Sequence, residues 1–165
     1  MTQKDKELLL KDLCGRLPYG VICQIYDPQQ DYGEDIFDAR LIHIDAWTSH
    51  CYFWGCSETD PYKIEQVKPY LRPMSSMTKE EKLHVELTYG FFYHDGVLDN
   101  VHIFEAGGTY DRDGNYEPPC EYRQEKHVTI EQVLDFIHWL NEHYFDYRGL
   151  IEKGLALEAP EGMYN

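Results

Sequence analysis

The chain has 165 residues, of which 30 are acidic and 15 are basic, and its formal net charge at pH 7 is −15. This charge excludes binding of nucleic acid or of an anionic membrane through a basic face. The aromatic content of 15% excludes a disordered acidic tail, and the length suits a single domain.

We expect no targeting signal in the N-terminal sequence, since its longest apolar run is the three leucines Leu8 to Leu10. A secretory signal needs an apolar stretch of roughly 7–15 residues, and a membrane span needs about 20. The five cysteines have no C-x-x-C spacing; they are Cys14, Cys23, Cys51, Cys56 and Cys120. An odd number of irregularly spaced cysteines favours free thiols in a reducing cytoplasm.

The first half of the chain predicts one helix and then short strands. Thr2 is a suitable N-cap for a helix from Gln3 to Cys14, and Gly15 is a suitable residue to end it. Strands are expected at Val21–Tyr26, Ile36–Ala46 and Cys51–Gly55, and a short strand or helix is expected at Ile64–Leu71. Because the connections are too short for parallel crossovers, we expect a small, mainly antiparallel sheet.

Two helices are predicted in the second half. Thr78 and Glu81 have capping-box spacing and predict a helix from Lys79 to about Gly90. Thr129 and Gln132 have the same spacing and predict a final helix ending near His143. Its apolar stripe is of the kind that packs on a core and comprises Ile130, Val133, Leu134, Ile137, Leu140 and Tyr144.

Further strands are expected at Phe91–Tyr93, Val101–Phe104 and Thr109–Glu117, with turns at Asp95-Gly96 and Asp113-Gly114. After the final helix, we expect an irregular tail over residues 145–165. We therefore expect a single α+β domain in which N-terminal, middle and C-terminal helices pack with the sheet.

Two segments contain metal-binding residue types. Asp111 to Glu117 resembles the start of a calcium loop, but its glycine is at position four and not six, so a β-hairpin turn explains it better. His50, Cys51 and Cys56, with His43 nearby, could supply zinc ligands. The C-x4-C spacing is unusual for zinc, and adjacent strand residues point to opposite faces. We therefore predict no metal site and no cofactor.

Motifs for catalysis are missing from the sequence. There is no G-x-S-x-G nucleophile elbow and no phosphate-binding loop, since Gly107-Gly108 has no following Lys-Ser/Thr. The acidic pair Glu80-Glu81 lies at a helix N-terminus, where the helix dipole explains it. No catalytic residue is assigned, although distant residues can still assemble an active site.

The C-terminal region concentrates groups that often dominate binding interfaces. The candidate binding residues are Trp139, His143, Phe145, Tyr147 and Arg148. In the alternative interpretation, Phe145 and Tyr147 pack under the final helix, and Asp146 either pairs with Arg148 or acts as a cap. A tail after a helix must be anchored to stay ordered, which favours this alternative.

Three stretches carry a resemblance to a known family. They are LPYGV at residues 17–21, VKPYLRPMSSMT at 67–78, and the tail, which includes FDYRGLIEKGLALEAPEGMY at 145–164. With these stretches, the chain resembles a family of small, acidic, uncharacterised proteins from phages and mobile elements of anaerobic gut bacteria. The resemblance implies a cytoplasmic setting, in a bacterial host or a phage-infected cell, and assigns no catalytic residue.

These observations predict a small non-enzymatic binding or accessory protein whose partner is another protein or, in a homo-oligomer, a second copy. The first alternative is an acidic inhibitor that imitates nucleic acid and blocks the basic cleft of a host defence or DNA-binding protein. The second alternative is a small hydrolase or ligand-sequestering protein built around a pocket of aromatic and histidine groups.

Overall fold

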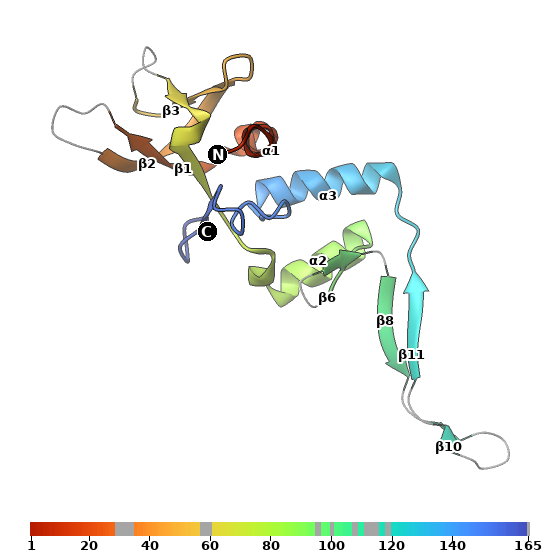
Figure 1. The fold of residues 1–165 in the computed structure, drawn as a ribbon. Coiled ribbons are helices and arrows are strands. Elements are labelled where there is room, and N and C mark those ends of the chain that lie inside the picture. The colour runs from red at the N-terminus through yellow and green to blue at the C-terminus, as the bar shows by residue number, and fades with distance from the viewer. Residues whose placement is uncertain are drawn as a thin grey trace. The chain divides into compact units, whose positions relative to one another are not determined.

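The computed structural model describes residues 1–28, 35–56, 61–94, 97–99, 101–106, 109–110, 116–117 and 120–164, and it describes no side chains within residues 94–125 (Figure 1). The chain divides into two compact units. The first unit comprises Met1–Ser76 and His138–Asn165, and the second comprises Met77–Ile137. The expectation of one domain stays a prediction.

The first unit is built on a six-stranded sheet with the strand order β12-β5-β1-β2-β3-β4. The strands are β1 (Ile22–Asp27), β2 (Asp35–Asp45), β3 (His50–Phe53), β4 (Tyr62–Lys63), β5 (Val67–Leu71) and β12 (Leu157–Glu158). Neighbouring strands are antiparallel except for β12, which pairs in parallel with β5. The expected α+β fold with a mainly antiparallel sheet is confirmed.

Helix α1 (Gln3–Arg16) packs its leucines into the core of the first unit. Thr2 and Asp5 form a capping box at its start. Leu9 and Leu13 are fully buried among inward-facing strand residues such as Cys23 and Ile25. This burial follows from helical spacing on one element and alternation on the other.

The expected end of α1 at Gly15 is wrong, because Gly15 lies within the helix. A Cβ at this position would lie 3.1 Å from Nδ2 of Asn141, so the glycine is explained by close packing. The helix continues to Arg16 and is followed by the 3-10 helix η1 (Leu17–Tyr19). The glycine that ends this turn is Gly20, with φ of +66°.

The segment 64–71 forms both of its expected alternatives, the 3-10 helix η2 (Ile64–Gln66) and then β5. A further 3-10 helix, η3 (Met74–Ser76), follows. The C-terminal segment is tied to the end of β5 by two backbone hydrogen bonds. Arg72 N donates to Tyr144 O at 2.8 Å, and Asp146 N donates to Arg72 O at 2.7 Å.

The second unit contains helix α2 (Lys79–Tyr89) and most of α3 (Ile130–Glu142), which continues into the first unit. Its strands form three antiparallel pairs: β6 (Phe92–His94) with β7 (Val97–Asp99), β8 (Val101–Ala106) with β11 (Cys120–Glu125), and β9 (Thr109–Tyr110) with β10 (Tyr116–Glu117). The expected turns at Asp95-Gly96 and Asp113-Gly114 lie outside the described residues.

Both capping boxes predicted for these helices are present. Glu81 N donates to Thr78 Oγ1 at 3.1 Å, and Gln132 N donates to Thr129 Oγ1 at 3.2 Å. The expected helix end at Gly90 is also confirmed, since this residue has φ of +79° and its N–H donates to the carbonyls of Val85 and Glu86.

The apolar stripe of α3 is only partly buried. Leu140 is 2% exposed, whereas Ile130 is 81% and Leu134 is 53% exposed. The aromatic side chains of Phe136 and Trp139, which lie off this stripe, are buried instead. The expectation that the whole stripe packs on a core is therefore wrong for the first turns of the helix.

Candidate functional site

The structure brings the predicted binding residues together at the end of α3, but it does not place them all on the surface. Trp139 is 8% exposed and Phe145 is fully buried. The Trp139 ring stacks on His143, with ring centroids 4.3 Å apart, and on Phe145, with centroids 5.5 Å apart. His143 and Tyr147 are half-buried.

A buried ion pair lies beside this cluster. Asp12 and Arg16, one helical turn apart on α1, are both fully buried. Arg16 Nε donates to Asp12 Oδ2 at 2.6 Å and Nη2 to Oδ1 at 3.0 Å. Nη2 also donates to the backbone oxygen of Phe145 at 2.8 Å, which joins α1 to the C-terminal segment. Charged, nearly bidentate bonds of this kind are among the stronger ones in proteins.

Arg148 and Tyr147 complete the arrangement. Arg148 Nε lies 3.3 Å from Asp12 Oδ1, and the guanidinium of Arg148 lies 4.8 Å from the centre of the Tyr147 ring. Tyr147 Oη donates to Asn141 Oδ1 at 3.2 Å. The groups proposed from sequence as binding determinants thus contact one another and α1, as in the anchoring alternative. Their role in binding a partner stays a prediction.

Asp146 acts as a cap and not as the partner of Arg148. Its two carboxylate oxygens accept hydrogen bonds from the backbone N–H groups of Leu150 and Ile151, each at 2.8 Å. This holds the turn that carries the buried residues Leu150 and Leu155. The tail is therefore fixed by polar as well as apolar contacts.

Two thiols of the first unit, those of Cys23 and Cys51, are buried. Burial raises the pKa of Cys51 to about 12 and also raises the pKa of Cys23. A thiol held protonated is a poor nucleophile. Across the residues that the structure describes, no group of three or more His, Cys, Asp or Glu side chains is arranged to hold a metal ion. The calcium-like segment, Asp111 to Asn115, lies outside them.

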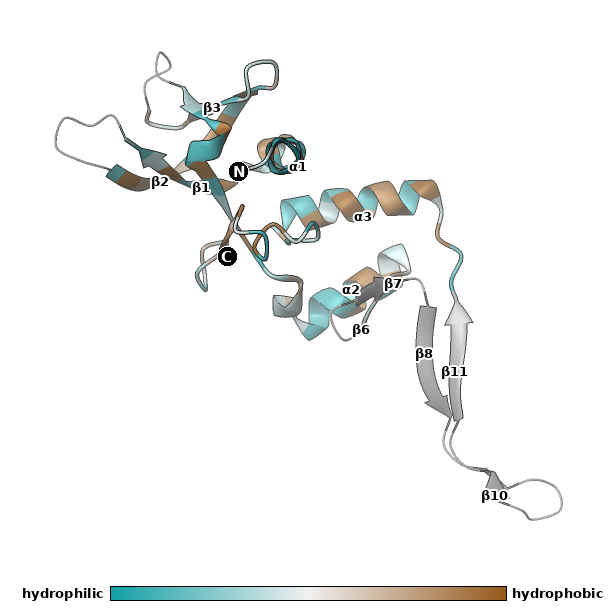
Figure 2. Ribbon diagram, in the orientation of Figure 1, coloured by the Kyte–Doolittle hydropathy of each residue, from teal (hydrophilic) through white to brown (hydrophobic). Residues whose placement is uncertain are grey.

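A different surface stands out on the second unit, and we call it the outer helix surface. It comprises five large apolar side chains on α2 and α3, with exposed fractions of 55% for Leu83, 70% for Leu87, 81% for Ile130, 36% for Val133 and 53% for Leu134. Figure 2 shows apolar and polar stretches alternating along both helices. Apolar side chains gathered on neighbouring helical turns are typical of docking surfaces.

The spacing of these residues explains why they are exposed on each helix. Leu83 and Leu87 are four residues apart and share one face of α2, whereas Val85, on the opposite face, is fully buried. On α3, Ile130, Val133 and Leu134 have i, i+3, i+4 spacing and likewise share a face. Each helix therefore has one apolar face turned inward and a second turned to solvent.

Carboxylates outnumber basic side chains beside the outer helix surface. Lys79 and Glu80 both lie about one turn before Leu83, and Glu131 and Asp135 are exposed on α3. Helix α3 contains no lysine or arginine, and the second unit as a whole has more than twice as many acids as bases. The surface thus has an apolar centre and a negative edge on α3.

The outer helix surface was missed in the sequence interpretation, although a signal for it was present. An 11-residue helix with Val85 on one face and Leu83 and Leu87 on the other has more apolar surface than one core contact requires. Such a helix predicts either burial on two sides or a binding face.

Comparisons with protein-family models, with curated proteins and with solved structures found no match to this chain. Within the described part of the chain, no helix has the length and apolar character needed to cross a bilayer.

Proposed function

We propose that this protein is a non-enzymatic binding or accessory protein that docks a protein partner on the outer helix surface. The observation that carries the proposal is the exposure of five large apolar side chains on α2 and α3. Complete burial of a leucine or isoleucine side chain contributes about 1.5–3 kcal/mol, so a partner that covers this surface gains considerable stabilisation.

The charged residues beside the outer helix surface indicate which kind of partner it binds. An amphipathic helix can bind through residues at i, i+3 and i+4 spacing, and carboxylates at the rim favour lysine and arginine at the edges of its apolar face. A second copy of the chain would bring acidic rims together, which is unfavourable. The proposed occupant is therefore a basic amphipathic helix of another protein, in the phage or mobile-element setting that the sequence predicts.

The acidic-inhibitor alternative has one observation in its favour, the excess of acids in the second unit. An imitation of nucleic acid depends on charge and needs no apolar contact. Its binding is expected to fall steeply with salt, because exposed charges are screened. The two functions therefore differ in their dependence on the leucines.

The test uses two synthetic peptides of identical composition, rich in Leu and Lys, one with an amphipathic helical pattern and one scrambled. Isothermal titration calorimetry measures their dissociation constants for the whole chain. We expect the patterned peptide to bind at least about tenfold more tightly than the scrambled one. Leu87→Glu and Leu134→Glu are expected to remove this preference, because each places a charge in the apolar contact.

Ile36→Glu is the matched control, since Ile36 is 59% exposed on β2 of the first unit. It introduces the same charge at a similarly exposed apolar residue and is expected to leave binding unchanged. Equal binding of both peptides, lost at high salt and unaffected by the leucine substitutions, would support the acidic inhibitor and exclude the proposed docking surface.

A further inference from the structure

Helix α3 carries negative charge along one edge of its exposed apolar face. Glu131 directly follows Ile130 in the sequence, and Asp135 directly follows Leu134. All four of these residues are exposed. Consecutive residues of a helix are about 100° apart around its axis, so the two acids lie in a row beside the apolar side chains. We call Glu131 and Asp135 the acidic row.

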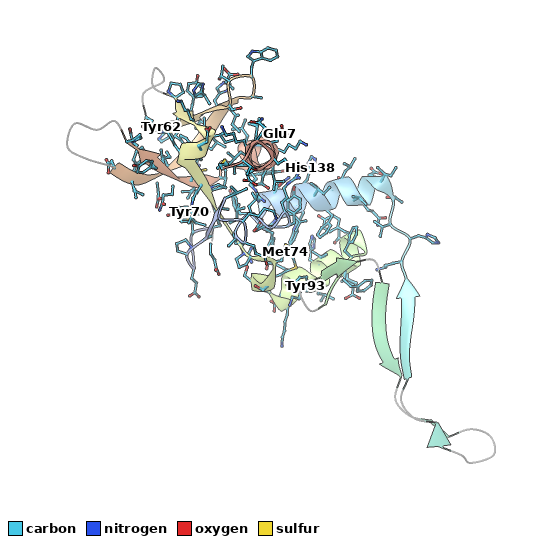
Figure 3. The ribbon with its side chains drawn as sticks, viewed as in Figure 1. Glu7, Tyr62, Tyr70, Met74, Tyr93 and His138 are labelled. Atoms are coloured by element: carbon cyan, nitrogen blue, oxygen red, sulfur yellow. The ribbon has the colours of Figure 1, made fainter. Side chains whose placement is uncertain are left out.

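The opposite edge of this apolar face has no charged side chain. The residues that directly precede the two apolar side chains are Thr129 and Val133, and they lie on the other side of the face. On the acidic side, the row continues along the helix through the exposed His138, which is labelled in Figure 3, to the exposed Glu142. The charge beside the apolar face of α3 is therefore one-sided.

Helix α2 differs, because charges of both signs flank its exposed leucines. Lys82 and Glu86 directly precede the two leucines, and Lys79 and Glu80 lie about one turn before the first of them. A partner with positive charge is attracted by some of these groups and repelled by others. The edge with a single sign of charge is thus the acidic row on α3.

A partner helix that packs along α3 meets the acidic row differently in its two orientations. In antiparallel packing, the residues that directly follow the apolar contacts of one helix lie beside the equivalent residues of the other. In parallel packing, they lie beside the residues that directly precede the apolar contacts. Opposite charges at such edge positions attract, and in coiled coils they determine the choice and orientation of the partner.

We propose that the acidic row sets the orientation of the partner helix, through lysine or arginine residues along one edge of the partner's apolar face. A partner whose basic residues directly follow its apolar contact residues docks antiparallel to α3. A partner whose basic residues directly precede them docks parallel. This inference rests on the proposed function, since it assigns the specificity of the same docking surface.

The test uses two synthetic amphipathic peptides of identical Leu, Lys and Gln composition. One has a lysine directly after each leucine, and the other has a lysine directly before each leucine. Each peptide carries a nitroxide at its N-terminus, which broadens nearby amide resonances of the ¹⁵N-labelled whole chain. The first peptide is expected to broaden the resonances of Ile137 and His138 more than that of Thr129, and the second is expected to give the reverse.

The double substitution Glu131→Gln with Asp135→Asn removes the acidic row. It is expected to abolish the difference in orientation between the peptides and to weaken their binding about threefold, because exposed ion pairs contribute little individually. The matched control is Glu152→Gln with Glu161→Gln, which removes two charges from exposed residues of the C-terminal segment. This control is expected to leave both orientations unchanged.

Three results would overturn the inference while the docking surface itself stands. They are the same orientation for both peptides, no preferred orientation for either peptide, and an unchanged difference in the Glu131→Gln and Asp135→Asn variant. Failure of both peptides to bind α2 and α3 would overturn the proposed function together with this inference.

Discussion

Arg16 is the largest fully buried side chain in the described part of the chain, and it joins α1 to the C-terminal segment, which is distant in sequence. Its guanidinium pairs with Asp12, lies 5.7 Å from the centre of the Tyr147 ring and donates to Phe145 O. Its Nη1 atom has no hydrogen-bond partner among the described residues. The Asp12–Arg16 pair thus holds the C-terminal segment against α1, and the carboxylate of Asp12 neutralises the buried guanidinium.

Asp12→Ala is expected to destabilise the protein by about 3–5 kcal/mol, because it leaves a buried guanidinium without its counter-charge. The double substitution Asp12→Leu with Arg16→Met is expected to recover a large part of this loss, since an apolar pair has no charge to desolvate. Urea unfolding measures both. A loss below about 1 kcal/mol for Asp12→Ala would show that the pair is not buried in solution.

Cys51 makes stability depend on pH in the alkaline range. Burial raises the pKa of its thiol from 9.0 to about 12 in the folded protein, so above pH 9 the unfolded chain loses a proton that the folded chain keeps. The stabilisation is complete below pH 9 and decreases by about 1.4 kcal/mol per pH unit as the pH rises toward the folded pKa.

Urea unfolding at pH 8, 9 and 10 tests this dependence, and Cys51→Ala is expected to reduce its slope. Cys14 is more exposed and burial raises the pKa of its thiol less, so Cys14→Ala is the comparison and should reduce the slope less than Cys51→Ala does. A slope that is the same in the Cys51→Ala variant would show that other groups cause the alkaline loss.

At the scale of elements, α2 shows how local signals define a helix. Thr78 N donates to Glu81 Oε2 at 2.8 Å in the capping box, and Gly90 ends the helix in the left-handed region. A Cβ on Gly90 would also lie 3.2 Å from Cδ of Lys126. The start of α2 is therefore specified by the Thr78–Glu81 pair and its end by Gly90.

Thr78→Ala is expected to cost about 1 kcal/mol, and Gly90→Ala about 1 kcal/mol or more because of its positive φ. Thr88→Ala, an exposed substitution in the last turn of the same helix, is the control with a smaller effect. Amide hydrogen exchange within α2 measures the local change. Equal protection in the Thr78→Ala variant and the wild type would contradict the role of the cap.

Elements whose signals are local could be predicted from the sequence. The caps of α2 and α3 and the alternation of β1 require only neighbouring residues, and these elements lie where expected. Gly15 could not be interpreted correctly, because its small size serves a contact with Asn141, far away in the sequence. The prediction that the whole apolar stripe of α3 is buried was wrong for a similar reason, because burial depends on which side of the helix packs against the rest of the protein.

The sites were less predictable than the fold. The concentration of aromatic groups near Trp139 was visible, but their internal contacts with α1 depend on tertiary structure. The outer helix surface, in contrast, could have been predicted from the helical spacing of Leu83, Val85 and Leu87.

At the scale of the whole molecule, charge and exposed apolar surface oppose each other. A net charge of −15 disfavours contact between two copies, whereas the outer helix surface favours contact with some protein. We therefore expect a monomer of 19.5 kDa in sedimentation velocity at about 0.15 M salt, where charges within roughly 8 Å of each other still interact. A dimer that Leu134→Glu dissociates would show that the surface is a self-association interface.

The central claim is that the outer helix surface binds a basic amphipathic helix. The most direct measurement is the footprint of the patterned Leu/Lys peptide on the ¹⁵N-labelled protein. The account predicts that amide shifts concentrate on α2 and on the first turns of α3, around Leu83, Leu87, Ile130 and Leu134. Shifts spread over the acidic residues of both units, with none concentrated on these helices, would contradict it.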